Sequence, residues 1–470
     1  MADTAAPPDP AVVDLVDAGV PADQGLVGLG LIMQLGGNLF AGFASLVLVI
    51  VLFAARSQSS EWLWGTCIVM SSIVRSIAHA NAGKQLVYGR PDQAAGGRLD
   101  AARRYTVFGI LHALGVGALA KFVLDAPGEL ALGLTLALAL WPVALFALLR
   151  LPRFARFEQL PLTEDKGFEG ASILMTLFGA CGVLVGGVML LVVFRLPGRV
   201  LQHGPNMLLV LALVMLFIRS LLHLHAGMSG LKTTSLDRSV ELTSRYANFG
   251  VISAFAAAGA LLVVAMTSEP SVPGLGLICI VCWLLLAWPL ILRRFFADRQ
   301  FSDLLAGNEA PVHRRAPDAG LTWLGWFLIA HAAMQGSLLV MTLFAGHAMR
   351  SQELFALVGA SATRSLWWSV GLYLLQAWAG YELVRMSPHS KVVATAYAAV
   401  AAAIVAYVNW PMIEAMSSMR HFGDDLFEMP VQLVQFGMIG VSLIIPVATF
   451  VLVRRHIAPA ARARYTTPSR

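Results

Sequence analysis

The sequence has little charge and few cysteines for its length. Of its 470 residues only 13% are charged and four are cysteines, whereas 58% are hydrophobic. All four cysteines lie inside apolar runs, which excludes an extracellular disulfide framework. So few charged residues could not cover the surface of a soluble fold. The composition therefore predicts an all-α integral membrane protein and excludes a secreted, disordered or nucleic-acid-binding chain.

The apolar residues are gathered into about 12 runs, each long enough to cross a hydrocarbon core of about 30 Å as a helix. The predicted transmembrane helices are 26–54, 62–84, 105–124, 129–149, 170–194, 207–229, 246–267, 274–292, 321–346, 365–384, 392–412 and 431–453.

Basic residues are distributed unequally between the two sets of loops. The loops on the side of the termini, with the C-terminal tail, hold 24 Lys and Arg, and the opposite loops hold 6. The positive-inside rule then places both termini in the cytoplasm of a bacterial-type inner membrane. The acidic tail over 1–25 has no Lys or Arg, so we expect no cleavable signal there.

Two stretches of four helices carry the same motifs, which indicates an internal duplication. The first stretch reads Arg-Ser-Ile-Ala-His where the second reads Arg-Ser-Leu-Leu-His, and both later contain Trp-Pro, which we interpret as a helix kink. The matching segments are 75–83 with 219–227, 100–109 with 241–250, and 141–142 with 288–289.

A third, divergent copy has Leu372 and Gln376 where the others have Arg and His, and its Ile445-Pro446 replaces Trp-Pro. Because each copy has four spans, the copies point the same way across the membrane. We therefore expect three parallel repeats around a pseudo-threefold axis. The predicted organisation is an acidic tail (1–25), repeat 1 (26–157), repeat 2 (168–300), a linker (301–319), repeat 3 (320–456) and a basic tail (457–470).

No acidic residue lies within the core of a predicted span, yet Arg75 and Arg219 do. A charge in hydrocarbon costs roughly 2.5–3.5 kcal/mol on insertion scales, so it requires a reason. Each arginine shares a helix face with a histidine four residues later. The predicted polar layer, in the cytoplasmic third of the membrane, consists of Arg75, His79, Arg219, His223, His112, Asn248 and Gln34.

Two interpretations of the arginines remain open. They could extend toward the inner headgroups or pair with Asp100 and Glu241, which would be a structural role. Alternatively, they could face the pseudo-threefold axis and bind an anion such as a phosphate, a carboxylate or a lipid headgroup.

Histidines also permit a haem. Neutral imidazole is a common axial ligand, so His79, His223 and His225 are the alternative ligands of a b-type haem. Positions i and i+2 of a helix face about 200° apart, so His223 and His225 cannot bind one ion together. We predict no metal site otherwise.

His331 and Gln335 on the ninth span, with Gln376 on the tenth, have no counterpart in the other copies. This departure from the repeat makes them gate candidates, although a helix-packing hydrogen bond would explain them equally well.

The sequence predicts a permease- or channel-like protein that binds or moves a small anionic or lipidic solute at the Arg/His layer, without a cofactor. One alternative is a membrane haem protein that transfers electrons, like a b-type cytochrome. The other is a non-catalytic subunit or assembly factor of a membrane complex. Its predicted partners are the lipid bilayer, the solute and other membrane subunits. An enzyme is not expected, because there is no nucleophile–base pair, metal triad or phosphate-binding loop.

Overall fold

The computed structural model describes residues 26–54, 60–88, 96–150, 168–195, 204–232, 236–267, 272–297, 319–348, 353–385, 387, 389–418, 440 and 442–454. These residues are almost entirely helical, and none of them is in a strand. Both predicted tails, and the predicted linker up to residue 318, lie outside the described residues.

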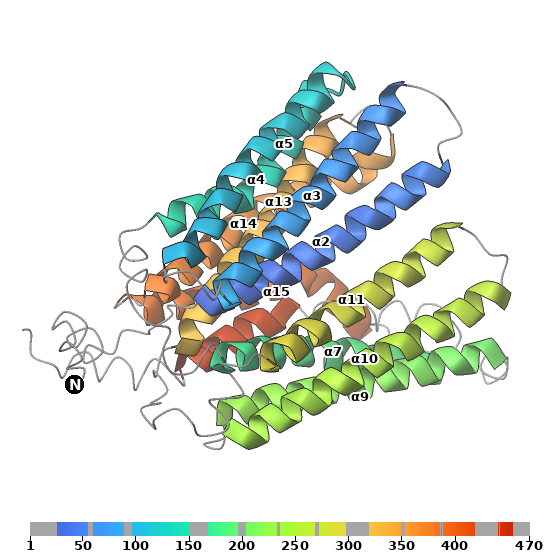
Figure 1. The fold of residues 1–470 in the computed structure, drawn as a ribbon, viewed down its shortest axis with the longest axis vertical. Coiled ribbons are helices and arrows are strands. Elements are labelled where there is room, and N and C mark those ends of the chain that lie inside the picture. Colours follow the sequence, from blue (N-terminus) through green and yellow to red (C-terminus); the bar gives the residue numbers. More distant parts are fainter. Residues whose placement is uncertain are drawn as a thin grey trace, which may run out of the picture.

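The helices form three groups in chain order (Figure 1). Group 1 comprises α2 (Leu26–Ala54), α3 (Ser60–Tyr88), α4 (Gly96–Phe122) and α5 (Gly128–Leu149). Group 2 comprises α7 (Phe168–Arg195), α9 (Gly204–Lys232), α10 (Leu236–Thr267) and α11 (Val272–Phe296). Group 3 comprises α13 (Ala319–Ala348), α14 (Glu353–Arg385), α15 (Ser390–Ser418) and a last helix, Ser442–Arg454.

Within the described residues, nine helices are long and apolar enough to cross a membrane. They are α2, α3, α4, α5, α7, α9, α10, α13 and α15. The prediction of an all-helical, multi-pass membrane protein is therefore confirmed. The predicted spans 274–292 and 365–384 lie within α11 and α14, whereas the span 431–453 is described only at residue 440 and from residue 442.

Several helices extend beyond the apolar runs from which they were predicted. The helix α4 starts at Gly96 instead of residue 105, and α14 starts at Glu353 instead of residue 365. Backbone hydrogen bonds continue regardless of where the hydrocarbon ends. An apolar run therefore predicts which part of a helix lies in the membrane core, but it does not predict where the helix begins or ends.

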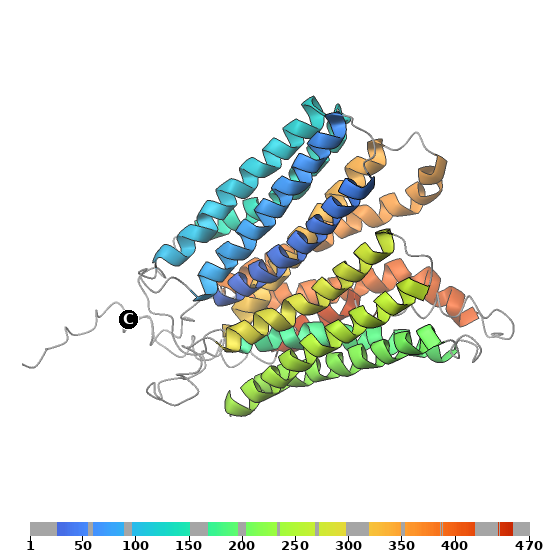
Figure 2. The ribbon, with the colours of Figure 1, turned by 45° about the vertical axis from the view of Figure 1, so that its right-hand side comes forward.

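Consecutive helices pack against one another within each group, and the groups are joined in a cycle (Figures 1 and 2). The first helix of group 1, α2, packs on the fourth helix of group 2, α11. The first helix of group 3, α13, packs on the fourth helix of group 1, α5. The cycle is completed by α7, whose Ile173 and Leu177 share a buried cluster with Leu452 and Val453 of the last helix.

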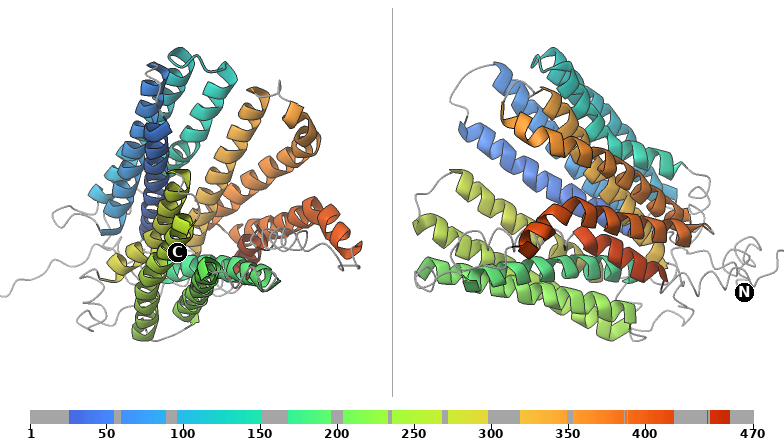
Figure 3. Two further views of the ribbon diagram at one scale, coloured as in Figure 1. Left: turned by 90° about the vertical axis from the view of Figure 1, so that its right-hand side faces the viewer. Right: turned by 180° about the vertical axis from the view of Figure 1, so that it is seen from behind.

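The first helices α2, α7 and α13 meet at the centre of the molecule (Figure 3). All residues of the segments 26–31, 170–175 and 321–326 are buried, unlike those of an ordinary amphipathic helix. Trp323 lies between Gly28 and Gly170, where a Cβ atom would stand 2.2 and 1.7 Å from the indole. Because these two glycines have no side chain, the Trp323 indole fits between them. It fills the centre of the bundle at the end where α2, α7 and α13 begin.

Candidate functional site

In group 1, Tyr105 of α4 and Trp141 of α5 contact His79, a buried residue of α3, and we call these three residues, with Arg75, cluster 1. The His79 ring stacks on Tyr105 of α4 at 4.6 Å between ring centroids and an angle of 8°. The indole Nε1 of Trp141 on α5 donates a hydrogen bond to His79 Nε2 over 3.1 Å. One turn earlier on α3, Arg75 Nη2 donates to the Leu138 carbonyl oxygen at 2.5 Å.

Group 2 has the same arrangement around His223 of α9, and we call it, with Arg219, cluster 2. The His223 ring stacks on Tyr246 of α10 at 4.1 Å and 4°. Trp288 Nε1 on α11 donates to His223 Nε2 over 2.9 Å. Arg219 donates through Nη2 to the Leu285 carbonyl oxygen at 2.5 Å, and through Nη1 to that of Gly250 at 3.3 Å. The repeated motifs thus make the same contacts in both places.

Each arginine donates to one carbonyl group that a proline leaves without an amide partner. Proline has no N–H, so the carbonyl four residues before it loses its helical hydrogen bond. Pro142 lies inside α5 and Pro289 inside α11. Counting back four residues gives Leu138 and Leu285. Each arginine therefore satisfies a carbonyl that would otherwise be unpaired in a dry environment.

Close packing on the same prolines explains the glycines of the repeated Phe-Gly segments. A Cβ atom at Gly109 would lie 2.7 Å from Pro142 Cγ, and one at Gly250 would lie 2.8 Å from Pro289 Cγ. A ring carbon of proline cannot move aside as the end of a flexible side chain does. The third helix of each group therefore needs glycine here to approach the proline of the fourth helix.

The arginines have no carboxylate among their described contacts. Asp100 pairs instead with Arg103 at 3.8 Å, and Glu241 with Arg245 at 2.5 Å, each within one turn of its own helix. The proposed pairing of Arg75 with Asp100, and of Arg219 with Glu241, is therefore not formed. Among the described residues, each guanidinium instead contacts carbonyl groups and a tyrosine of the next helix.

The arginines are turned toward the fourth helix of their own group. Their described hydrogen bonds involve α4 and α5 for Arg75, and α10 and α11 for Arg219, and not the central helices α2, α7 and α13. The two clusters share no described contact, so the predicted single polar layer is resolved into two separate clusters.

The clusters differ in how far the arginine is enclosed. Arg219 is 8% exposed and makes hydrogen bonds to two carbonyl groups, whereas Arg75 is only half-buried and makes one such bond. One turn before Arg75, Ser71 Oγ lies 3.1 Å from His112 Nε2, which brings His112 to the same side of α3. Cluster 1 is thus the more open and the richer in hydrogen-bonding groups.

The remaining members of the predicted layer do not join these contacts. Gln34 is buried on α2, and its side-chain nitrogen has no described hydrogen-bond partner. Asn248 lies on the exposed face of α10, and His225 is exposed on α9.

The predicted gate residues do come together in group 3. Gln376 Nε2 of α14 lies 2.8 Å from His331 Nδ1 of α13 and donates to the Leu328 carbonyl oxygen at 3.2 Å. Gln335 Nε2 lies 3.5 Å from His331 Nε2. At the position where groups 1 and 2 tie the second helix to the fourth, group 3 ties the second helix to the first.

This geometry fits poorly with a haem between the two histidines. His79 and His223 belong to different groups, and the Nε2 atom of each already accepts a hydrogen bond from a tryptophan. Ligation through Nε2 would break that bond. His79 and His223 therefore do not fit as the two axial ligands of one haem.

Sequence reasoning missed the tyrosines and tryptophans as partners of the histidines. The repetition of Tyr105 as Tyr246, directly after an arginine in both copies, was the signal available. A comparison of the chain with protein-family models, with curated proteins and with solved structures finds no match.

Proposed function

We propose that this multi-pass membrane protein is permease-like and binds a small anionic or lipidic solute at cluster 1, beside Arg75. The observation that carries the proposal is Arg75 itself, a residue inside a predicted span that is only half-buried and has no carboxylate contact among the described residues. A charge kept at such a depth, when an apolar residue stands at the matching position of group 3, is typical of a solute pathway.

The neighbours of Arg75 suit an anion of modest size. A guanidinium has five N–H donors, of which the Leu138 carbonyl takes one. Tyr105 is hydrogen-bonded to Arg75 as well. The His112 ring lies one turn away at Ser71, whose hydroxyl donates to the Ile68 carbonyl oxygen, so the guanidinium is the main donor here. Hydrogen bonds between ionised partners are about twice as strong as neutral ones, so a phosphate or carboxylate would gain most here.

Cluster 2 has a different role in this proposal. Arg219 is enclosed and its donors are directed to two carbonyl groups, so it serves to hold α9, α10 and α11 together. In this proposal Arg75 of group 1 binds the solute, whereas Arg219 of group 2 stabilises the fold. This asymmetry within a duplicated pattern is why we assign binding to one arginine and not to both.

The architecture we propose is three parallel four-helix repeats around a pseudo-threefold axis, in an inner membrane with both termini in the cytoplasm. The matching contacts of clusters 1 and 2 and the cyclic packing of first on fourth helices support it. Trp323 fills the centre of the bundle at one end, so the proposed route for the solute is through group 1 and not along that axis.

The test is stabilisation of the purified protein in detergent by inorganic phosphate, sulfate or acetate. A ligand at roughly ten times its Kd adds about 1.4 kcal/mol to the free energy of unfolding. We expect at least one anion to raise the melting temperature of the wild-type protein with saturation, and Arg75→Met to abolish the rise. The control Arg245→Gln, which removes an exposed arginine, should keep it. Equal responses of all three proteins would contradict the proposal.

A further inference from the structure

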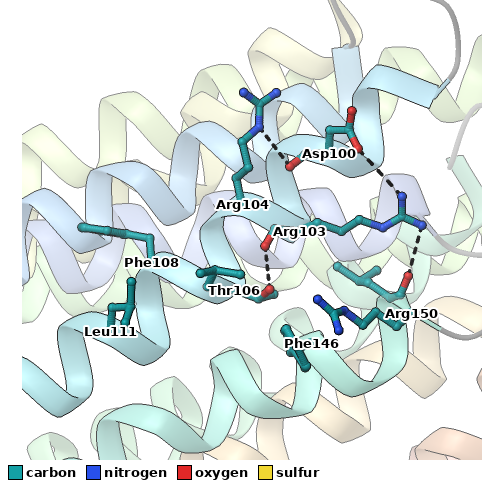
Figure 4. Close-up of a pocket in the computed structure, with 10 residues that line it drawn as sticks. Asp100, Arg103, Arg104, Thr106, Phe108, Leu111, Phe146 and Arg150 are labelled. Atoms are coloured by element: carbon teal, nitrogen blue, oxygen red, sulfur yellow. Dashed lines mark hydrogen bonds and ion pairs between the residues drawn. The ribbon is translucent and has the colours of Figure 1, made fainter.

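A second basic site lies at the end of group 1 where α4 begins and α5 ends. It is a pocket of about 460 Å³ between these two helices, within the size range of small-ligand sites (Figure 4). Arg103 and Arg104 of α4 and Arg150, which follows α5, line its polar part. Phe108 and Leu111 of α4 and Phe146 of α5 line its apolar part.

The polar part carries a net positive charge. Arg103 pairs with Asp100 and donates through Nη2 to the Leu149 carbonyl oxygen at 3.4 Å, which fixes its side chain between the two helices. Arg104 is exposed, and the guanidinium of Arg150 lies 3.8 Å above the ring of Phe146. Three arginines against one aspartate leave a net charge of about +2 where an anion can reach it.

The apolar part continues down the membrane face of α4. Phe108 is 39% exposed and Leu111 is 62% exposed, and Leu114, less than one turn further on, is 55% exposed. Positions 108, 111 and 114, each three residues apart, lie along one side of the helix. The span of α4 is 99–122 and that of α5 ends at Leu149, so the arginines lie at the membrane interface and the apolar stripe runs from them into the hydrocarbon.

We propose that this pocket binds one anionic phospholipid. Its phosphate lies among Arg103, Arg104 and Arg150, and an acyl chain lies along Phe108, Leu111 and Leu114. A free phosphate would use only the arginines and leave the apolar wall uncovered. The positive-inside rule places this end of the bundle toward the cytoplasmic leaflet, where anionic lipids attract basic residues.

The matching end of group 2 offers an internal control. There Ser244 stands at the position of Arg103, and Arg245 is held by Glu241 at 2.5 Å. The other arginines at that end, Arg293 and Arg294, lie on the last turn of α11, and Arg294 lies over the ring of Tyr88. Removal of these three charges changes the total charge as much as removal of the pocket arginines.

The experiment counts bound lipids by native mass spectrometry of the full chain in detergent, titrated with phosphatidylglycerol or with phosphatidylcholine. The test variant is Arg103→Gln/Arg104→Gln/Arg150→Gln, and the control variant is Arg245→Gln/Arg293→Gln/Arg294→Gln. Basic residues at the membrane surface attract anionic lipids in preference to zwitterionic ones. We expect the wild type to bind one phosphatidylglycerol at least roughly tenfold more tightly than phosphatidylcholine, the test variant to lose this preference, and the control to keep it.

Several outcomes would overturn the proposal. They are equal affinity for the two lipids, equal losses in both triple variants, and displacement of the lipid by 10 mM inorganic phosphate, which would indicate a simple anion site. If the triple variant does not fold, Arg104→Gln and Arg150→Gln alone change only exposed side chains, and each must weaken phosphatidylglycerol binding. A fourth variant, Arg75→Met, must leave it unchanged, which separates this site from cluster 1.

Discussion

Clusters 1 and 2 are built from the same residue types on corresponding helices, yet they enclose their arginines to different extents. In cluster 2 the residue Arg219 is 8% exposed, and its guanidinium is bonded to two carbonyl groups. In cluster 1 the residue Arg75 is half-buried, and its guanidinium is bonded to one. In both clusters the arginine binds a carbonyl group of the proline-containing fourth helix and so holds that helix in place. The clusters differ in the N–H donors of the arginine that remain available for a solute.

Group 3 extends the comparison, because it lacks three members of the cluster together. Leu372, Gln376 and Ile445 stand where the other groups have Arg, His and Trp. In clusters 1 and 2 the tryptophan donates to the histidine, and the arginine lies one turn from that histidine. Group 3 has none of these three residue types at the positions that we match to them.

The largest expected effect is the loss of Arg219. The variant Arg219→Met leaves the Leu285 carbonyl group and the Tyr246 hydroxyl without their arginine donor in a dry environment and removes one of the donors to the Gly250 carbonyl, which should cost about 2–4 kcal/mol of unfolding free energy. Arg75→Met should cost about half as much, because Arg75 is less buried and donates to one carbonyl group instead of two. Unfolding in mixed micelles measures both values. An equal or larger loss for Arg75→Met would show that the clusters do not differ as described.

Next in size is the steric effect at the two glycines that face the prolines. Gly250→Ala and Gly109→Ala place a Cβ atom 2.8 and 2.7 Å from a proline ring carbon. Overpacking of this kind costs about 1–3 kcal/mol, and we expect similar losses in the two clusters. Gly115, which has nothing within 4 Å of its Cβ position, is the control. Gly115→Ala should be neutral or slightly stabilising in the same unfolding assay.

The link between arginine and proline is tested by a double-mutant cycle. Pro289→Ala restores an amide that can bond to the Leu285 carbonyl oxygen, so Arg219→Met should cost less in that background. We expect a coupling free energy of about 1–2 kcal/mol. Additive effects of the two substitutions would refute the claim that Arg219 satisfies the carbonyl freed by Pro289.

The smallest effect is expected for the indole hydrogen bonds. Trp288→Phe and Trp141→Phe keep an aromatic ring but remove the donor to the histidine, at a cost of about 0.5–1.5 kcal/mol each. The loss should be slightly greater for Trp288, which is 5% exposed. A matched pair, Trp288→Phe with and without His223→Leu, should show no further loss from the tryptophan once the histidine is absent.

Whether a feature could be predicted from the sequence depends on how far apart along the chain the interacting residues lie. The spans were predictable because apolarity is a property of each segment by itself. One of the open interpretations paired Asp100 with Arg75, but Asp100 pairs with Arg103, three residues away on its own helix. The sequence alone gives no distance between helices.

The contacts within the clusters depend on how each helix is rotated about its own axis. A repeated sequence motif does not define this rotation. Trp141 and Trp288 were interpreted through their prolines as parts of kinks, and their bonds to His79 and His223 join positions more than 60 residues apart. The acceptor at Leu138 is a backbone group and has no sequence signature of its own. Only the offset of four residues from Pro142 indicates it.

The central claim, that cluster 1 holds an anion beside Arg75, is tested most directly at Ser71. In a protein whose four native cysteines are replaced, Ser71→Cys puts a small thiol one turn from Arg75, and a membrane-impermeant thiol reagent reports its access to water. We predict that Cys introduced at 71 is labelled, that phosphate, sulfate or acetate slows the labelling, and that Arg75→Met removes this protection. Labelling that no anion slows, or protection that persists without Arg75, would contradict the account.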